Sequence, residues 1–291
     1  METRIPQFRI YLIQEEYAET SIQEHINNVT RFLEWASKEM HETDEMSYND
    51  LMAYVKQERE SSISTPTIIN RLLSIRHYYE HLKKEGIIDK NPVKKVQIKK
   101  DARRIVTDVL EPEMLTSVYE SYVQLNKQTH IQEKTAIAHQ RNVVILGLMI
   151  WQGLHSGELS KMELIYIKLN EGKVYIPSTR RSKSRWLSLD ARQIIALHSY
   201  IETLPVNSQF LFRCNVRNAV FSIVEEIKGI NPVIQNAAHI RSSVILGWLK
   251  QHKKRTVQYM IGHKYITSTE HYEQQELSKL INQLEKHHPL S

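Results

Sequence analysis

The sequence predicts a mainly α-helical protein of two domains, a helical bundle followed by an α+β domain with a small antiparallel sheet. Apolar residues recur at three- and four-residue steps through most of the chain, which is the period of an amphipathic helix. Apolar and polar residues alternate clearly only in the segment 165–190, as in a half-buried strand. The length of 291 residues, 41% of them hydrophobic, is sufficient for two packed cores.

The first 90 residues are predicted to form a bundle of helices. Apolar stripes at helical spacing predict helices at residues 21–40 and 65–84. Ser47, followed three residues later by Asp50, has the spacing of a capping box that opens another helix between them. Gly86 follows the second stripe, where a glycine commonly ends a helix.

Basic residues are dense in the segment 91–105, which we predict to be a linker between domains at residues 1–90 and 106–291. The net charge of +6 favours a polyanionic partner. A dense basic segment beside a helical module more often contacts nucleic-acid backbone, although a merely solubilising tether is the alternative. The residues predicted to contact DNA are Arg71, Arg76, Lys94, Lys95, Lys99, Lys100, Arg103 and Arg104.

The second domain, residues 106–291, is predicted to surround one small sheet with helices. The predicted helices lie at residues 111–126, 135–152, 190–203, 215–228, 235–250 and 254–261. Between the second and third of these, the alternating segment has a turn at Asn170–Gly172 and predicts the antiparallel sheet. The sequence has no glycine-rich nucleotide loop, no HExxH and no GxSxG, so nucleotide-driven and zinc-hydrolase classes lose their usual support.

Composition also restricts location and cofactors. The longest apolar run, Val143 to Trp151, is far shorter than the roughly 20 residues of a membrane span. The amino terminus mixes charges with apolar residues and lacks a signal-peptide pattern, so we expect a cytoplasmic protein, nucleoid-associated when bound to DNA. The single cysteine, Cys214, argues against an internal disulfide or a cysteine-rich zinc site. We expect no cofactor, metal, membrane or small-molecule partner.

Three residues near the carboxyl end form the most informative pattern in the sequence. Arg241 opens a predicted helix, His263 follows Gly262, and Tyr272 comes nine residues after His263. This pattern resembles the tyrosine recombinases, the phage integrase family of site-specific DNA recombinases. The segment INRLLSIRHYYEHLKKEGIIDKNPVKK also resembles the last helix of that family's core-binding domain and its exit into the linker. The resemblance covers nearly the whole chain.

The resemblance implies that Arg241, His263 and Tyr272 converge on one scissile phosphate. In the family, the tyrosine forms a 3′-phosphotyrosyl link and frees a 5′-hydroxyl. An arginine fork matches phosphate oxygens, and histidine can exchange a proton near neutral pH. Tyrosine, with a reference pKa of about 10, becomes a usable nucleophile only beside such cations. The implied partners are double-stranded DNA and further copies of the chain, as a homo-oligomer (tetramer) on DNA, without a metal or nucleotide cofactor.

Two positions depart from the family pattern. The segment GLHSGEL places His155 where the family has its first active-site arginine, and Ala238 stands where it usually has a histidine. In the hairpin sequence PSTRRSKSRWLSL, Arg180 aligns with the family lysine, and Arg181 and Lys183 are its neighbours. These cations either replace the lost arginine or contact only the DNA backbone. His155 itself can donate a hydrogen bond but lacks a permanent charge.

The sequence therefore supports a site-specific recombinase or integrase with Tyr272 as nucleophile. The alternative is a catalytically impaired DNA-binding regulator or accessory protein on the same scaffold, because losing one donor to transition-state charge commonly costs about 10² to 10³ in rate. A helical protein-interaction module is a third hypothesis, which leaves the spacing of Arg241, His263 and Tyr272 unexplained. We expect an apolar stripe beyond Tyr272 to dock on a neighbouring subunit rather than on its own core, through Leu277, Leu280, Ile281 and Leu284.

Overall fold

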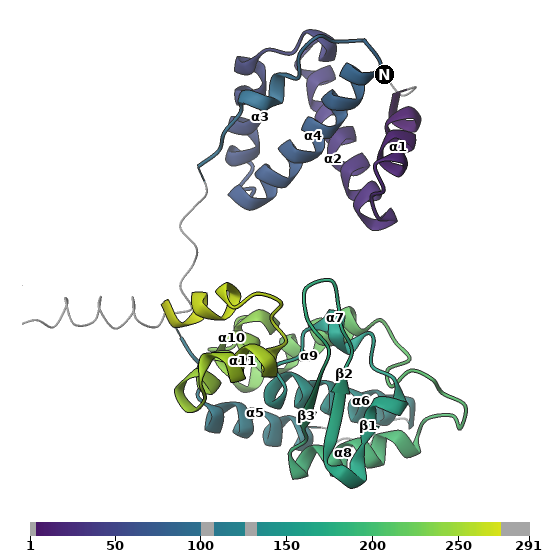
Figure 1. The fold of residues 1–291 in the computed structure, drawn as a ribbon, viewed down its shortest axis with the longest axis vertical. Helices are drawn as coiled ribbons and strands as arrows, with labels where there is room; N and C mark the ends of the chain where they lie inside the picture. Colours follow the sequence, from purple (N-terminus) through teal and green to yellow (C-terminus); the bar gives the residue numbers. More distant parts are fainter. Residues whose placement is uncertain (1–3, 100–107, 126–132, 275–291) are drawn as a thin grey trace, which may run out of the picture. The chain divides into compact units, whose positions relative to one another are not determined.

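The computed structural model describes residues 4–99, 108–125 and 133–274. The chain divides into two compact units, residues 1–103 and residues 104–291 (Figure 1). Within the described residues, no helix is both long and apolar enough to cross a membrane.

The first unit is a helical bundle around an aromatic core. Phe32 packs edge-on against Tyr54 and Tyr79, with ring centroids 5.3 and 6.1 Å apart. All three side chains are buried, and such edge-to-face pairs add to the stabilisation from burial. The elements are α1 (Arg4–Gln14), α2 (Glu19–Lys38), η1 (Thr43–Glu45), α3 (Tyr48–Glu60), α4 (Thr65–Lys84) and η2 (Pro92–Lys95).

The local signals in this bundle act as predicted. Ser47 and Asp50 form the reciprocal capping box at the start of α3. Gly86 follows the last residue of the α4 cap with φ of +72°, a left-handed conformation that favours glycine. α1 lies outside the predicted helices, because it buries only Phe8, Tyr11 and Leu12 and its apolar stripe is short.

The structure differs from the predicted linker at its amino-terminal end. The Asn91 side chain donates hydrogen bonds to the Arg76 carbonyl oxygen (2.9 Å) and to Glu80 Oε1 (3.0 Å). Val93 is buried in the core of the bundle, and Val96 and Ile98 are partly buried against the same core. These apolar side chains attach the stretch after Asn91 to the first unit. The prediction of a linker from residue 91 considered the lysines and not the apolar residues between them.

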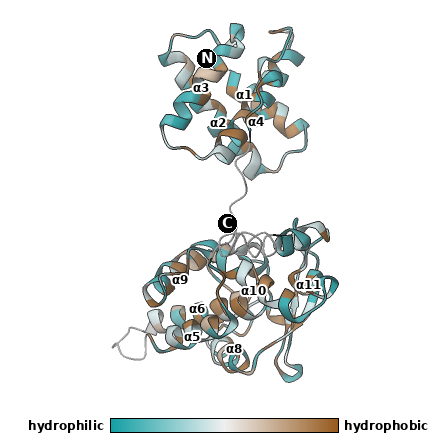
Figure 2. Ribbon diagram, turned by 90° about the vertical axis from the view of Figure 1, so that its left-hand side faces the viewer, coloured by the Kyte–Doolittle hydropathy of each residue, from teal (hydrophilic) through white to brown (hydrophobic). Residues whose placement is uncertain are grey.

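The second unit is built around two apolar helices. Almost every residue from Val143 to Ile150 in α6 is buried, as are most of the residues from His239 to Gly247 in α10. Figure 2 shows both helices with mainly hydrophobic residues at the centre of this unit. The helices of the unit are α5 (Pro112–Gln124), α6 (Glu133–Trp151), α7 (Ser156–Leu159), α8 (Ala191–Glu202), α9 (Val216–Ile230), α10 (Ala237–Gln251) and α11 (Lys254–Ile261). Residues 267–274 are also helical.

The predicted antiparallel sheet is confirmed, with strand order β1-β2-β3. Its strands are β1 (Ile167–Lys168), β2 (Lys173–Ile176) and β3 (Arg185–Ser188). The short turn η3 (Leu164–Tyr166) precedes β1, and η4 (Leu169–Glu171) connects β1 to β2. Val174, Ile176 and Leu187 face the core, which fixes the register of Val174 against Leu187. The loop after β2, residues 177–184, carries Arg180, Arg181 and Lys183.

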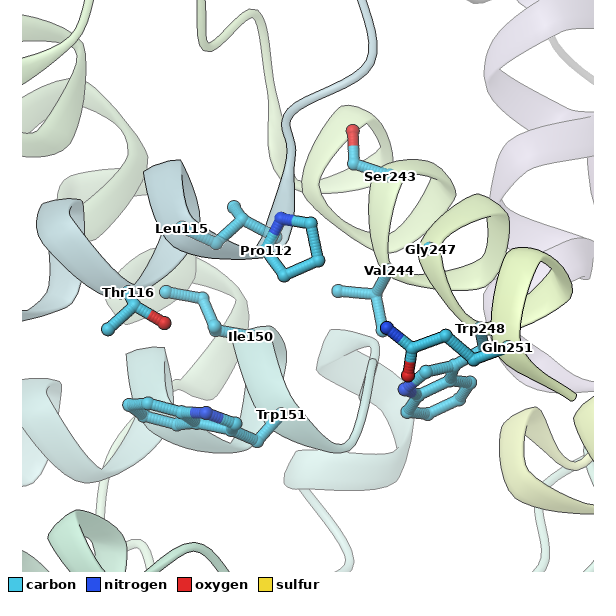
Figure 3. A pocket seen from close by; sticks show the side chains of 10 residues that line it. All are labelled: Pro112, Leu115, Thr116, Ile150, Trp151, Ser243, Val244, Gly247, Trp248 and Gln251. Atoms are coloured by element: carbon cyan, nitrogen blue, oxygen red, sulfur yellow. The ribbon is translucent and has the colours of Figure 1, made fainter.

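A small apolar pocket of about 130 Å³ lies where α5, α6 and α10 meet (Figure 3). Trp151 and Trp248 form one side of it, and Leu115, Pro112 and Val244 supply further apolar surface. The pocket is separate from the polar residues described next.

Candidate active site

A buried carboxylate, Glu158 of α7, connects the elements of the site. Its side chain is 0% exposed. It accepts hydrogen bonds from Arg185 Nη1 (2.7 Å), from Arg241 Nη1 (3.2 Å) and from the His155 backbone N–H (3.2 Å). Burial by itself raises the pKa of Glu158, but the charges of Arg185 and Arg241 outweigh burial and bring that pKa below its usual value. The carboxylate is therefore ionised, and it ties α7 to β3 and α10.

Arg185, the first residue of β3, is the most enclosed cation of this network. Its Nε donates to the Met260 carbonyl oxygen (2.6 Å), and its Nη1 also donates to the Lys183 carbonyl oxygen (3.1 Å). A Cβ atom at Gly262 would overlap Nη1 of Arg185, and Gly262 has φ of +78°. Position 262 therefore requires glycine both for its backbone conformation and for the space that Arg185 occupies.

Arg241, in the second turn of α10, is held by several acceptors at once. Besides Glu158, it donates from Nη2 to the Ile261 carbonyl oxygen (3.2 Å) and from Nη1 to the Gly153 carbonyl oxygen. Burial lowers the pKa of Arg241, and Glu158 opposes that effect. Only 15% of the side chain is exposed, so one edge of an oriented guanidinium faces solvent.

His263 lies beside both Arg241 and Tyr272. Its Nδ1 hydrogen-bonds with the buried Thr269 hydroxyl (2.9 Å), and its ring stacks on that of Tyr272 with centroids 6.0 Å apart and planes 13° apart. Burial, followed by the charges of Arg241 and Arg185, lowers the pKa of His263 to about 4. His263 is therefore neutral at pH 7.

The helical segment with Tyr272 is fixed against its own chain. The Tyr272 ring contacts the apolar cluster of Ile245, Val257 and Ile261. Lys254 Nζ, at the start of α11, pairs with Glu273 Oε2 (2.7 Å) and Glu270 Oε1 (3.5 Å) on either side of Tyr272. The tyrosine thus stands in the same chain's site, next to His263.

Arg241 and His263 border an open cleft of about 620 Å³, which we call the active-site cleft. Exposed cations from the β2–β3 loop and from position 264 reach the cleft, and none of the described residues that line it is acidic. Its polar lining includes His155, Arg180, Arg181, Arg241, His263 and Lys264. An array of cations without a carboxylate suits a phosphate group.

Of the sequence-predicted site residues, five line the active-site cleft: His155, Arg180, Arg181, Arg241 and His263. Tyr272 stacks on His263 but is not among the residues that line this cleft. Lys183 borders a neighbouring cleft instead, and its backbone N–H donates to the Gly262 carbonyl oxygen (2.8 Å). His239 does not replace the histidine missing at Ala238, because its buried ring hydrogen-bonds with the Asp108 carbonyl oxygen and accepts from the Gln235 backbone N–H.

His155 caps α7, and this role occupies its ring. Nδ1 accepts from the Gly157 backbone N–H (3.0 Å), and Nε2 lies 3.6 Å from Glu158 Oε2. Burial lowers the pKa of His155, so it carries no permanent charge toward the cleft.

Sequence reasoning missed four residues of the site. Glu158 and Arg185 are far apart in the chain, and Thr269 has no distinctive motif. Lys264 could have been predicted from the sequence, because it is a cation that directly follows the predicted site residue His263.

The residues predicted to contact DNA fall into four groups, of which the last is Arg71 alone. Arg76, Lys95 and Lys99 are exposed. Lys94 pairs with Glu80 (3.1 Å) but remains half exposed. Lys100, Arg103 and Arg104 lie outside the described residues.

Arg71 differs from the expectation of a free basic side chain. It forms an ion pair with Glu58, and its side chain is only 12% exposed. A guanidinium in so enclosed a place needs a carboxylate partner, because an unpaired buried charge is costly. The helical stripe did not reveal that partner, which lies in α3.

Comparisons with known proteins agree over both units. Residues 5–86 match the family described as phage integrase, N-terminal SAM-like domain. The chain is 22% identical over 295 residues to tyrosine recombinase XerC of Bacillus pumilus, covering 95% of this chain and 93% of the relative. It is 23% identical over 301 residues to a tyrosine recombinase of Pseudothermotoga lettingae, covering 98% and 99%.

Solved structures show the same fold. XerH site-specific recombinase bound to difH substrate, in a pre-cleavage complex, matches with a TM-score of 0.66 and 19% identity, covering 87% of this chain and 77% of that chain. A lambda integrase dimer bound to a COC′ core site matches with a TM-score of 0.68 and 12% identity, covering 94% and 76%.

The fold is thus that of the tyrosine recombinases, and the resemblance seen in the sequence is confirmed. The chain is a divergent homologue of that family, and its first unit is a phage integrase N-terminal SAM-like domain.

We predict that Arg185→Met lowers the free energy of unfolding by about 3–5 kcal/mol, because Glu158 would remain buried with one of its charged partners missing. Guanidinium unfolding followed by tryptophan fluorescence measures the change. Lys183→Met, in the exposed loop two residues earlier, is the matched control and should stay within about 0.5 kcal/mol of wild type. A similar, small change in both variants would contradict the role given to Arg185.

We also predict that His263 titrates near pH 4 and that Arg241→Gln raises its pKa toward the ordinary value of about 6.5. The unfolded chain takes up this proton at higher pH than the folded chain, so His263 should reduce stability as pH falls from about 6.5 to 4. NMR of the imidazole nitrogens measures the titration directly. Titration of His263 at or above pH 6.5 would refute the electrostatic description.

Proposed function

We propose that this protein is a site-specific DNA recombinase that breaks and rejoins double-stranded DNA through a 3′-phosphotyrosyl intermediate on Tyr272. The observation that carries the proposal is the active-site cleft, where Arg241, His263 and exposed cations stand beside a tyrosine and no acidic residue lines the described walls. Homology to tyrosine recombinases supports this class of reaction.

In the proposed reaction, the scissile phosphate occupies the active-site cleft. Arg241 directs its free edge at the non-bridging oxygens, where charge develops in the transition state. The Tyr272 oxygen forms a bond to phosphorus, the bond from phosphorus to the 5′ oxygen breaks, and that oxygen gains a proton to leave as a 5′-hydroxyl. Reversal by a 5′-hydroxyl of a partner strand rejoins the DNA and releases Tyr272.

Neutral His263 suits the transfer of the tyrosine proton. Its Nδ1 hydrogen-bonds with Thr269 and its ring stacks on Tyr272, so Nε2 is the nitrogen that we propose for contact with the phenol. A neutral imidazole can accept a proton, whereas an imidazolium cannot. We propose that His263 takes the phenolic proton as the bond from the Tyr272 oxygen to phosphorus forms, because bond formation makes that proton far more acidic than in free tyrosine. The side chain of Ala238 cannot perform this role.

The charge absent at His155 has candidate substitutes in the β2–β3 loop. Arg180 and Arg181 are exposed and line the active-site cleft. We propose that one or both donate to the phosphate in place of the family's first arginine, since arginine offers a permanent charge and a planar fork.

A second candidate function is a DNA-binding regulator or accessory protein that has lost turnover. The capping role of His155 favours it, because Nδ1 is occupied by the Gly157 backbone N–H and the imidazole brings no permanent charge to the cleft. The two functions differ in whether the loop arginines restore the lost stabilisation.

We further propose a homo-oligomer on DNA, a tetramer when two duplexes are joined. Exchange of both strands between two duplexes cleaves four strands, and each needs its own Tyr272. The apolar pocket of α5, α6 and α10 (Figure 3) offers a surface for a neighbouring copy. We propose that it takes the apolar stripe beyond Tyr272, whose residues lie outside the described part of the chain: Leu277, Leu280, Ile281 and Leu284.

The decisive measurement is covalent capture on a nicked suicide duplex. The duplex is obtained by selection from a random-sequence library with the Tyr272→Phe variant, and adducts are detected by denaturing electrophoresis. We expect an adduct with wild type and none with Tyr272→Phe. Arg180→Ala or Arg181→Ala should lower single-turnover cleavage by about 10²-fold or more, because a donor to transition-state charge is lost, while affinity changes far less.

Lys168→Ala, an exposed lysine of β1, is the matched control and should leave cleavage unchanged. No adduct with wild type, but an adduct with His155→Arg, would establish the impaired alternative. Adduct formation that persists in Tyr272→Phe would falsify the nucleophile assignment.

The salt dependence of DNA binding should depend on the lysines of the segment that follows α4. We predict that replacing Lys95 and Lys99 by glutamine makes the slope of log affinity against log salt less negative by as much as about 0.9 per lost phosphate contact. The same pair of changes at Lys168 and Lys173 is the control, because these exposed lysines lie on the sheet. Equal slopes for the two variants would show that the segment does not contact phosphate.

A further inference from the structure

We propose that a second cleft, adjoining the active-site cleft, binds the nucleotide next to the scissile phosphate on the cleaved strand. The inference rests on the proposed function and adds a subsite to it. The second cleft has a volume of about 640 Å³ and lies between the β2–β3 loop, α11 and the turn after His263. His263, Lys264 and Tyr265 line both clefts, so the two are contiguous.

The charge of the second cleft suits a nucleotide phosphate. Lys183, Arg255 and Lys264 line it, and no acidic residue is among its described lining. Arg255 donates to the Gln258 amide oxygen (3.0 Å), a neutral partner that leaves its charge uncompensated. Three cations without a carboxylate attract a phosphate and gain from release of its counterions.

The cleft also presents an aromatic ring for a base. Tyr265 is 72% exposed, although a large ring on a protein surface loses free energy by contact with water. Its carbonyl oxygen accepts from the Ser268 backbone N–H (3.2 Å), which fixes its backbone at the entrance to the helix of Tyr272. Exposed rings flanked by cations are typical of surfaces that stack nucleotide bases.

Tyr259 has a different role in the same cleft. Its hydroxyl accepts from the Trp186 backbone N–H (3.3 Å) and donates to the Trp186 carbonyl oxygen (3.4 Å), so it is attached to β3. Tyr259 forms part of the wall, and Tyr265 is the ring available for stacking.

The proposed subsite would retain the strand end that cleavage releases. When the phosphate moves to Tyr272, the new strand end is no longer covalently held, and its terminal base pair can open. A base stacked on Tyr265, with its phosphate on Lys183, Lys264 and Arg255, keeps that end near the active site for rejoining. The subsite therefore contributes to strand retention rather than to bond breakage.

Photocrosslinking tests the inference without requiring turnover. The Tyr272→Phe chain is mixed with the selected duplex, in which 5-iododeoxyuridine replaces one nucleotide at a time on either side of the scissile phosphate. After irradiation, mass spectrometry locates the crosslinked residue. We expect a crosslink to Tyr265 from a nucleotide next to the scissile phosphate, and retention of that crosslink at position 265 in Tyr265→Phe.

Tyr265→Ala should abolish this crosslink and weaken duplex binding by about 5- to 100-fold, because base stacking on an aromatic ring is lost. Phe221→Ala is the matched control, since Phe221 of α9 is 69% exposed and lies outside both clefts. Lys264→Gln should reduce the salt slope by about 0.9, whereas Lys168→Gln should leave it unchanged.

The outcomes separate this inference from the proposed function. Adduct formation by wild type together with unchanged affinity of Tyr265→Ala, or crosslinks only at other residues, overturns the subsite and leaves the recombinase standing. A chain that binds no duplex at any salt concentration overturns both.

Discussion

The ionised carboxylate of Glu158 is the constraint on which the site depends. It is 0% exposed and shared between Arg185 and Arg241, which belong to different elements of the second unit. A buried charge is tolerated only when its partners are well placed, and loss of one partner leaves an uncompensated charge. The same carboxylate accepts the backbone N–H of His155 and so closes the start of α7. One interaction therefore sets the positions of α7, β3 and α10 together.

This constraint explains which residues of the site are interchangeable and which are not. Gly262 lacks a side chain because Arg185 fills the space where a Cβ would stand. His263 is held neutral because its own burial, and then the charges of Arg241 and Arg185, disfavour its protonated form and lower its pKa. The buried cations Arg185 and Arg241 thus hold the elements of the site together. The exposed cations Arg180 and Arg181 line the cleft, where they can contact a ligand. Exposed positions can exchange roles without disturbing the network beneath them.

The departures from the family pattern have a local physical account. At position 155 the imidazole caps α7 through the Gly157 backbone N–H, so the helix keeps a capping residue although a charge is lost. At position 238 alanine is the second residue of α10, and the neighbouring buried His239 hydrogen-bonds with the Asp108 carbonyl oxygen. The backbone around the cleft is therefore intact, and any change in chemistry arises from the side chains that face it.

The sequence by itself determined most of the long helices, the small sheet and the spacing of Arg241, His263 and Tyr272, because periodicity, caps and turns act over a few residues. Even the capping box of Ser47 and Asp50 formed as its spacing predicts. Only the tertiary structure decided that Glu158 pairs with Arg185, that Arg71 pairs with Glu58, and that the stretch after Asn91 packs on the bundle. Glu158 and Arg185 are 27 positions apart in the chain, and Glu58 and Arg71 are 13 positions apart. No local pattern encodes these contacts, because their free energy comes from burial and charge pairing that exist only once the elements have come together.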